Sequence, residues 1–224
     1  MNSRYDLLLE PQQAGLAEPS LLEAALAAKA GGADSITMHV RGDRRHVQEQ
    51  DVRDVMAECE LPLNFEMAST AEMVGIALKL APDFVCLVPE NRQEISTEGG
   101  LDVAGQLESL RTTVATLQAA GSKLSMFIDP ESEQVLASAE LGAEMIELHT
   151  GCFANAEGEE RAAEVARLAD ASRLGQELGL QVNAGHGINY HNLSELWPVP
   201  NRAELYTGPS TVTRAIDRKC VVLG

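Results

Sequence analysis

The sequence predicts an α/β protein that folds as a single, compact (β/α)8 TIM barrel. Short runs of β-forming residues alternate with longer segments of helical periodicity, which is typical of a parallel α/β fold. Eight such runs in a chain of 224 residues favour a closed barrel. A doubly wound open sheet is the competing fold, but no GxGxxG pattern follows the first run. We therefore expect one barrel domain over residues 1–224.

The expected strands are short apolar runs that end in polar or turn-forming residues. Several follow a helix that ends in glycine, as in ELGAEMIELHT, where a left-handed glycine caps the helix and turns the chain. Apolar residues recur at every third or fourth position over 20–31, 101–121 and 159–179, which predicts helices there. The expected strands cover residues 6–10, 35–40, 61–68, 83–90, 123–129, 145–151, 180–187 and 203–208.

Composition restricts the class of partner. The chain has 34 acidic residues against 17 basic ones, and its net charge of −17 disfavours binding to nucleic acid or to an anionic membrane. A phosphate ligand must therefore be bound by local donors. Only a short apolar run precedes Glu10 and Pro11, so we expect no signal peptide or membrane span and a cytoplasmic enzyme.

The cysteines are far apart in the sequence and form no metal-binding spacing, so we expect free thiols in a reducing compartment. Cys86 lies in the apolar run FVCLV, which favours a buried structural role. Cys152 follows an expected strand end, and a functional role stays open for it. The other two are Cys59 and Cys220.

Polar residues gather at one end of the expected strands. In (β/α)8 barrels the active site lies at the C-terminal ends of the strands and in the loops that follow. Such a group of imidazoles and carboxylates is suited to binding a metal or to moving protons between reacting groups, and both uses stay open here. The group comprises His39, His46, His149, His186, His191, Glu66, Glu90, Asp129 and Glu147.

Three segments are candidates for binding phosphate. HVRGDRRH (39–46) carries three arginines, whose guanidinium groups match phosphate oxygens, although a solvated loop that balances nearby carboxylates fits as well. TEGGLDVAG (97–105) leads into a predicted helix N-terminus, where free N–H groups can bind an anion. TGPS (207–210) lies after the last strand, where this fold often binds phosphate, and a simple capped turn is the alternative.

Taken together, HVRGDRRH, LNFEMA, LVPENRQEISTEGGLDVAG, FIDP, IELHTG and VNAGHGINYHN resemble the pyridoxine 5′-phosphate synthase family, in the family's order, over roughly residues 21–195. The resemblance implies a (β/α)8 barrel, usually an octamer, that works without a metal or an organic cofactor. The implied reaction condenses 1-deoxy-D-xylulose 5-phosphate with 3-amino-2-oxopropyl phosphate. Its product is pyridoxine 5′-phosphate, an intermediate of vitamin B6 biosynthesis.

The resemblance also implies roles for single residues. His39 and Glu66 would accept protons during the condensation, and His186 would donate one. The deoxyxylulose phosphate would contact one set of residues and the amino-ketone phosphate another. These substrate-binding residues are Arg41, His46 and Thr97 for the former, and Gly187 and Gly208 for the latter.

Two segments depart from the family pattern. The family has basic residues in a substrate-binding loop after the first strand, whereas residues 7–20 contain none and predict a shortened loop. The family has a histidine where Pro209 follows Gly208, and the last helix is expected to be short. The alternatives are a diverged paralogue that acts on a different amine or on a single sugar phosphate, and a non-catalytic barrel subunit that associates with an active homologue.

Overall fold

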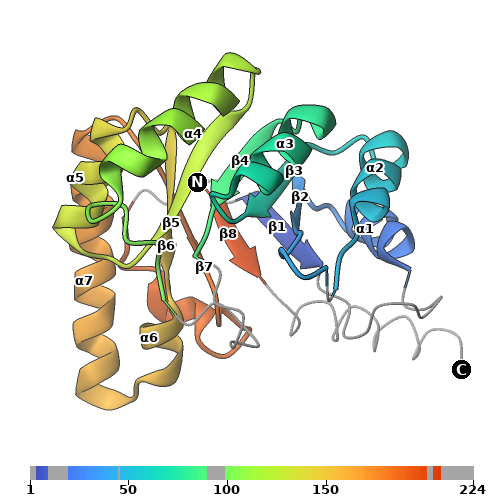
Figure 1. Cartoon of the computed structure of the whole chain (residues 1–224). Coiled ribbons are helices and arrows are strands. Elements are labelled where there is room, and N and C mark those ends of the chain that lie inside the picture. Colours follow the sequence, from blue (N-terminus) through green and yellow to red (C-terminus); the bar gives the residue numbers. More distant parts are fainter. Residues whose placement is uncertain (1–3, 10–19, 45, 90–98, 201–203, 208–224) are drawn as a thin grey trace, which may run out of the picture.

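The computed structural model describes residues 4–9, 20–44, 46–89, 99–200 and 204–207. Its strands are β1 (Arg4–Leu9), β2 (Ser35–His39), β3 (Leu63–Met67), β4 (Phe84–Leu87), β5 (Lys123–Ile128), β6 (Met145–His149), β7 (Gln181–Gly185) and β8 (Glu204–Thr207). They form one closed parallel barrel in chain order, because β1 pairs with both β2 and β8 (Figure 1). This closure confirms the predicted barrel and excludes an open doubly wound sheet.

Helices follow most strands and cover the outside of the barrel (Figure 1). They are α1 (Leu21–Ala30), α2 (Glu49–Glu58), α3 (Ala71–Leu80), α4 (Leu107–Ala119), α5 (Ser132–Glu140), α6 (Gly151–Asn155), α7 (Gly158–Glu177) and the short 3₁₀ helix η1 (Leu193–Leu196). The expected short first loop and last helix involve residues 10–19 and 208–224, which lie outside the described residues. The single-domain organisation stays a prediction.

The local signals in the sequence account for many of the helix ends. The Ser20 hydroxyl accepts the Glu23 N–H at the start of α1, and the Thr70 hydroxyl accepts the Met73 N–H at the start of α3. Gly142 and Gly179 follow α5 and α7 with φ values of 80° and 83°, the left-handed conformation that the repeated ELG pattern predicts. These glycines turn the chain directly into β6 and β7.

The two faces of each strand bury different chemistry. Ile36 and Met38 of β2 belong to the large apolar core that also includes residues of the surrounding helices. The alternate residues Thr37 and His39 are buried as well, on the opposite face of the strand. Since the apolar face packs against the helices, the face with Thr37 is turned into the barrel, where Asn64 of β3 donates a hydrogen bond to the Thr37 hydroxyl at 3.1 Å. The inward face of β2 and β3 is therefore polar.

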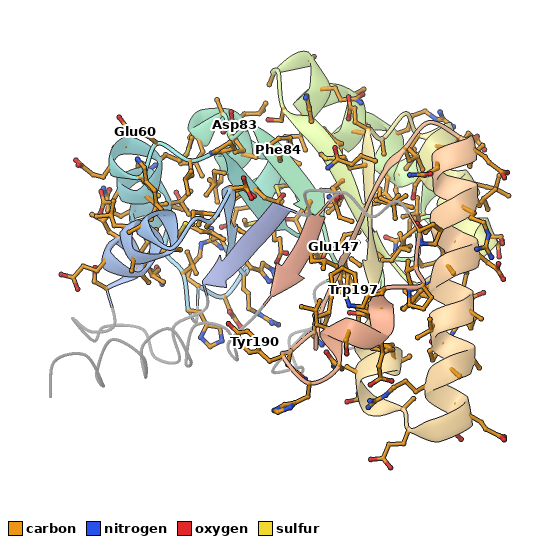
Figure 2. The ribbon with its side chains drawn as sticks, turned by 180° about the vertical axis from the view of Figure 1, so that it is seen from behind. Glu60, Asp83, Phe84, Glu147, Tyr190 and Trp197 are labelled. Atoms are coloured by element: carbon orange, nitrogen blue, oxygen red, sulfur yellow. The ribbon has the colours of Figure 1, made fainter. Side chains whose placement is uncertain are left out.

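The two ends of the barrel serve different purposes. At the N-terminal end of the strands, the carboxylates of Asp83 and Glu144 accept the backbone N–H groups of Leu63 and Leu124, at 3.1 and 2.8 Å. Figure 2 shows Asp83 on the side of the molecule away from Tyr190, which lies in the segment after β7. The carboxylates at the N-terminal end thus stabilise the starts of the strands, while the histidines and carboxylates of the candidate site lie toward the C-terminal end. None of the described helices is long and apolar enough to cross a membrane.

Candidate active site at the C-terminal ends of the strands

The first pair of candidate residues lies at the ends of β2 and β3. His39 and Glu66 are cross-strand neighbours in the barrel register. His39 Nδ1 is 3.8 Å from Glu66 Oε2, and both side chains are almost wholly buried. Since the two residues end adjacent parallel strands on the inward face, the barrel brings together the two residues that the sequence predicts as proton acceptors.

A second carboxylate faces the same interior from β6. Glu147 is buried, and its Oε2 lies 3.8 Å from Cys86 Sγ of β4. Burial, with the negative charges of Glu147 and Glu66, raises the pKa of Cys86 well above its usual range. Cys86 therefore stays a protonated thiol between two carboxylates, and a protonated thiol is a poor nucleophile. Its burial confirms the position that the sequence predicts.

The third group of side chains lies at the ends of β5, β6 and β7. His149 Nδ1 is 2.9 Å from Asp129 Oδ1, and the rings of His149 and His186 meet edge to face with centroids 4.9 Å apart. The hydrogen bond from His149 lowers the pKa of Asp129, and the backbone N–H of Gly100 lowers it further, against the opposing effect of burial. His186, the predicted proton donor, thus contacts an imidazole that is held by an ionised carboxylate.

The backbone around His186 is held in an uncommon conformation. His186 has φ of 80° and Gly187 has φ of 76°, so both residues are left-handed. The Thr150 hydroxyl is 2.6 Å from the Gly185 carbonyl oxygen and 2.5 Å from that of His186. A side chain at Gly187 would meet Ala154 of α6 at 2.6 Å. This turn therefore requires glycine after His186, a requirement that the NAGHG motif satisfies.

The arginine-rich segment after β2 divides into residues with different uses. Arg41 is buried, and His46 is half-buried in the same loop. Arg44 instead makes ion pairs with Glu72 at 2.6 Å and Glu49 at 3.3 Å. For Arg44 the structure thus favours the alternative that the segment balances nearby carboxylates, because its charge is paired within the protein. Arg45 lies outside the described residues.

The glycine-bearing segment after β4 differs from its prediction. The helix expected from residue 101 begins only at Leu107, and the preceding residues form turns. Five N–H groups between Gly100 and Gly105 already have acceptors within the protein, so these five are not available to an anion. The donors and acceptors are Gly100 to Asp129, Leu101 to the Phe127 carbonyl, Val103 and Ala104 to Gln134 Oε1, and Gly105 to Asp102 Oδ1.

Gly100 allows this segment to lie against the end of β5. A Cβ at residue 100 would lie 2.1 Å from the backbone nitrogen of Asp129. We therefore expect Gly100→Ala to lower the free energy of unfolding by about 1 to 3 kcal/mol, measured by chemical denaturation. Gly75→Ala is the matched control, because Gly75 lies inside α3 and a Cβ there would meet no atom within 4 Å. In the Gly75→Ala control the free energy of unfolding should rise by about 0.5 to 1 kcal/mol. Equal effects of the two substitutions would contradict the packing argument.

The described structure places most of the predicted site residues on one end of the barrel. Thr97 and Gly208 lie outside the described residues, and so do Glu90 and Pro209. His191 is exposed, and its backbone N–H donates to Asn189. Cys152 is an exposed free thiol on α6, and Cys59 is a buried one. The free thiols are thus confirmed for the three described cysteines, whereas Cys220 lies outside the described residues.

The sequence places Asp129, Glu147 and His149 in the group of strand-end imidazoles and carboxylates but assigns none of them an individual role. The signal that was available is the two-residue spacing of Glu147 and His149 in one strand, which places both on the inward face. The contact between His149 and Asp129 joins two strands and cannot be deduced from spacing alone. In the described ranges, no group of three or more His, Cys, Asp and Glu side chains is placed to hold a metal ion. Catalysis without a cofactor stays a prediction.

Comparisons with known proteins agree on the family. The family model described as pyridoxal phosphate biosynthesis protein PdxJ matches residues 11–218. The pyridoxine 5′-phosphate synthase of Akkermansia muciniphila is 57% identical over 200 residues, covering 89% of this chain and 81% of that protein. The enzyme of the same name from Synechococcus sp. (strain CC9605) is 49% identical over 199 residues, covering 89% of this chain and 80% of that one.

Solved structures with similar folds are more distant in sequence. An N-acetylmannosamine-6-phosphate 2-epimerase from Clostridium perfringens has a TM-score of 0.64 at 16% identity, over 99% of this chain and 93% of its own. A phosphoribosyl anthranilate isomerase from Thermus thermophilus has a TM-score of 0.60 at 14% identity, over 99% of this chain and 100% of its own. These two similarities support the barrel fold alone. On the sequence matches, the chain belongs to the pyridoxine 5′-phosphate synthase family of enzymes, transferases of vitamin B6 biosynthesis.

Proposed function

We propose that the chain condenses 1-deoxy-D-xylulose 5-phosphate with 3-amino-2-oxopropyl phosphate to form pyridoxine 5′-phosphate, releasing phosphate and water. The observation that carries the proposal is the buried pair of His39 and Glu66 at the strand ends, with the ring of His186 on the same rim. Family membership supports the same reaction. The barrel end offers several proton-transferring groups around one interior.

The chemistry needs groups that take protons from the substrates. An amine that attacks a carbonyl must lose its protons to become an imine, and ring closure must remove protons from carbon. Glu66 and His39 are suited to accept them, because a carboxylate and an imidazole 3.8 Å apart can both reach one bound substrate, directly or through a water molecule. Two acceptors in one place support a reaction with several successive proton transfers.

The reaction also needs a group that gives a proton to a departing oxygen. A carbonyl oxygen leaves as water only after it is protonated, which is the role we propose for His186. The left-handed turn at His186 and Gly187 brings an imidazole and an exposed backbone segment to the same rim. We propose that Gly187, together with Gly208, contacts the amino-ketone phosphate through its backbone.

The sugar phosphate would bind at the segment after β2. Arg41 supplies a buried guanidinium group, and His46 supplies an imidazole from the same loop. We propose that these two residues and Thr97 bind the phosphate and hydroxyl groups of deoxyxylulose phosphate. Because the chain has an overall charge of −17, such local donors must attract the phosphate against a repulsive background.

Arg44 supports this segment rather than binding the ligand. Its Nη1 donates to the carbonyl oxygens of Arg41, at 3.3 Å, and Gly42, at 2.7 Å, while Nη2 pairs with Glu72. We expect Arg44→Gln to raise the KM for deoxyxylulose phosphate about fivefold, equivalent to about 1 kcal/mol, with little change in kcat. Arg111→Gln is the control, because Arg111 also bridges two glutamates but lies on the outer helices. An unchanged KM in the Arg44 variant would show that the loop needs no such support.

One sequence feature favours a second candidate function. Residues 7–20 contain no lysine or arginine, where the family has basic residues that grip substrate. A variant reaction on the same sugar phosphate with a different, unphosphorylated amine would need fewer cations there. It is the alternative that the next experiment separates from the family reaction.

Calorimetric titration with deoxyxylulose phosphate, followed by 3-amino-2-oxopropyl phosphate, tests the proposal. Binding of the first and formation of pyridoxine phosphate after the second would support it. Binding of the sugar phosphate with no product would favour a different amine, and absence of any binding would favour a non-catalytic subunit. We also infer that the chain acts in the cytoplasm, where phosphorylated metabolites are made, as a homo-oligomer; the free thiols of the described cysteines fit a reducing compartment.

A further inference from the structure

The pair formed by Asp129 and His149 has no part in the roles proposed so far. It lies at the ends of β5 and β6, where neighbouring strands pair up to Ile128 and Leu148. His149 is a buried side chain, 3% exposed, and its Nδ1 is 2.9 Å from Asp129 Oδ1. The carboxylate partner holds this buried imidazole in one orientation. A fixed orientation is what a histidine needs when it takes part in a reaction or supports a group that does.

The tautomer of His149 follows from its partner. The pKa of Asp129 is lowered, first by the hydrogen bond from His149 and then by the Gly100 N–H, so the carboxylate is ionised and can only accept. The proton of a neutral His149 ring must therefore sit on Nδ1. Its Nε2 then carries the lone pair, and this atom is buried with no hydrogen-bond partner among the described residues.

His149 Nε2 and the edge of the His186 ring lie beside the same residue, Gly151. A Cβ at Gly151 would lie 2.4 Å from His149 Nε2 and 3.2 Å from His186 Cδ2, so both rings converge over this glycine. The two rings meet at an interplanar angle of 62°, edge to face. Phe127 packs against His149 with centroids 5.2 Å apart, which closes another side of the ring.

His186 is thus held at two places. The Thr150 hydroxyl contacts the carbonyl oxygens of Gly185 and His186 and so fixes the left-handed backbone. The ring of His149 packs against the ring of His186, with centroids 4.9 Å apart, and a ring in contact with its neighbour has less room to rotate. Without His149 the described residues would leave this ring with fewer constraints, and a proton donor that is misplaced by about 1 Å can lose about 100-fold in rate.

We propose that Asp129 and His149 are positioning residues that hold His186 in the orientation required for proton donation. The expected changes in kcat rest on the proposed function. The expected change in the position of the His186 ring rests on the side-chain geometry alone. Asp129 fixes His149 through Nδ1, and His149 in turn fixes the ring of His186. Neither residue needs to touch the substrate.

Asp129→Asn is the most direct test. The asparagine oxygen can still accept the Gly100 N–H, but its amide then presents a donor to His149 Nδ1, which forces the proton to Nε2. We expect kcat for pyridoxine phosphate formation to fall about 100-fold while the KM for deoxyxylulose phosphate stays within about twofold. A variant with unchanged kcat, or with a raised KM alone, would overturn the proposal.

Asp102→Asn is the matched control. Asp102 lies between β4 and α4, two residues after the Gly100 whose N–H is bound by Asp129, and in the described structure its Oδ1 accepts the Gly105 N–H at 2.9 Å and Gln134 Nε2 at 3.0 Å rather than bonding to a histidine. The same chemical change there should leave kcat unchanged. A fall in kcat equal to that of Asp129→Asn would show that the loop, not the histidine pair, carries the effect and would overturn the proposal.

Two further readouts separate this proposal from the proposed function. Gly151→Ala inserts a methyl group between the two rings without changing a charge, and it should also lower kcat with little change in KM. Crystal structures of the Asp129→Asn and Asp102→Asn proteins should show a displaced His186 ring in the first only. If the unaltered protein makes no pyridoxine phosphate, the proposed function fails, yet the ring position still decides the positioning role: an unmoved His186 in Asp129→Asn would overturn it.

Discussion

Replacing Glu66 by glutamine is expected to lower kcat for pyridoxine phosphate formation by about 10³-fold. Glutamine has nearly the same volume but cannot accept a proton, and general bases contribute about 10² to 10⁴ to such reactions. Glu66 is 8% exposed, beside His39, so water cannot readily substitute for it. Substrate binding should change far less than turnover, and the KM for deoxyxylulose phosphate should stay near its original value.

Glu144→Gln makes the same substitution at the other end of the barrel. Glu144 accepts the Leu124 N–H at 2.8 Å, and it supports strand entry rather than the site. This control should keep full kcat and show at most a small loss in thermal stability. Comparable turnover in Glu66→Gln and Glu144→Gln would remove Glu66 from the mechanism, provided that circular dichroism shows both proteins folded.

Replacing Arg41 by methionine should raise the KM for deoxyxylulose phosphate about 10- to 100-fold, with a smaller effect on kcat. A hydrogen bond to a charged group is worth about 1.5 to 3 kcal/mol, and Arg41 is buried at 3% exposure. Methionine retains the length and apolar character of the stem. The KM of Arg41→Lys should fall between those of the unaltered protein and Arg41→Met, because lysine keeps the charge but loses the planar guanidinium group that matches phosphate oxygens.

Arg53→Met is the control for this measurement. Arg53 lies on α2, where its side chain is about half exposed and pairs with Glu49 at 3.9 Å. It should leave KM and kcat unchanged. The steady-state KM is checked by direct titration with deoxyxylulose phosphate, since KM equals the dissociation constant only when chemistry is slow. Unaltered affinity in Arg41→Met would contradict the proposed sugar-phosphate site.

The fold was predictable because strand and helix signals repeat along the chain. Each predicted strand overlaps an observed one, from β1 to β8. The glycine that ends each predicted helix before β6 and β7 adopts the left-handed conformation that the pattern requires. The start of α4 was predicted wrongly at residue 101, because the apolar residues Leu101 and Val103 are buried in turns that carry the same spacing as a helix.

The site was predictable only as far as strand ends place residues on one rim. His39 and Glu66 follow from that rule, since both end adjacent strands. The ion pair of Arg44 could not be predicted in this way, because its partner Glu72 lies 28 residues further along the chain. The contact of His149 with Asp129 spans 20 residues and depends on side-chain orientation, which periodicity does not encode.

The central claim is that the acid–base residues at the C-terminal end of this barrel close the pyridine ring. A continuous absorbance assay of the purified protein with both phosphorylated substrates, with the product identified by mass spectrometry, tests it most directly. The account predicts pyridoxine 5′-phosphate and one equivalent of inorganic phosphate from the unaltered protein, and about 10³-fold slower formation by Glu66→Gln. Absence of product at saturating concentrations of both substrates would contradict it.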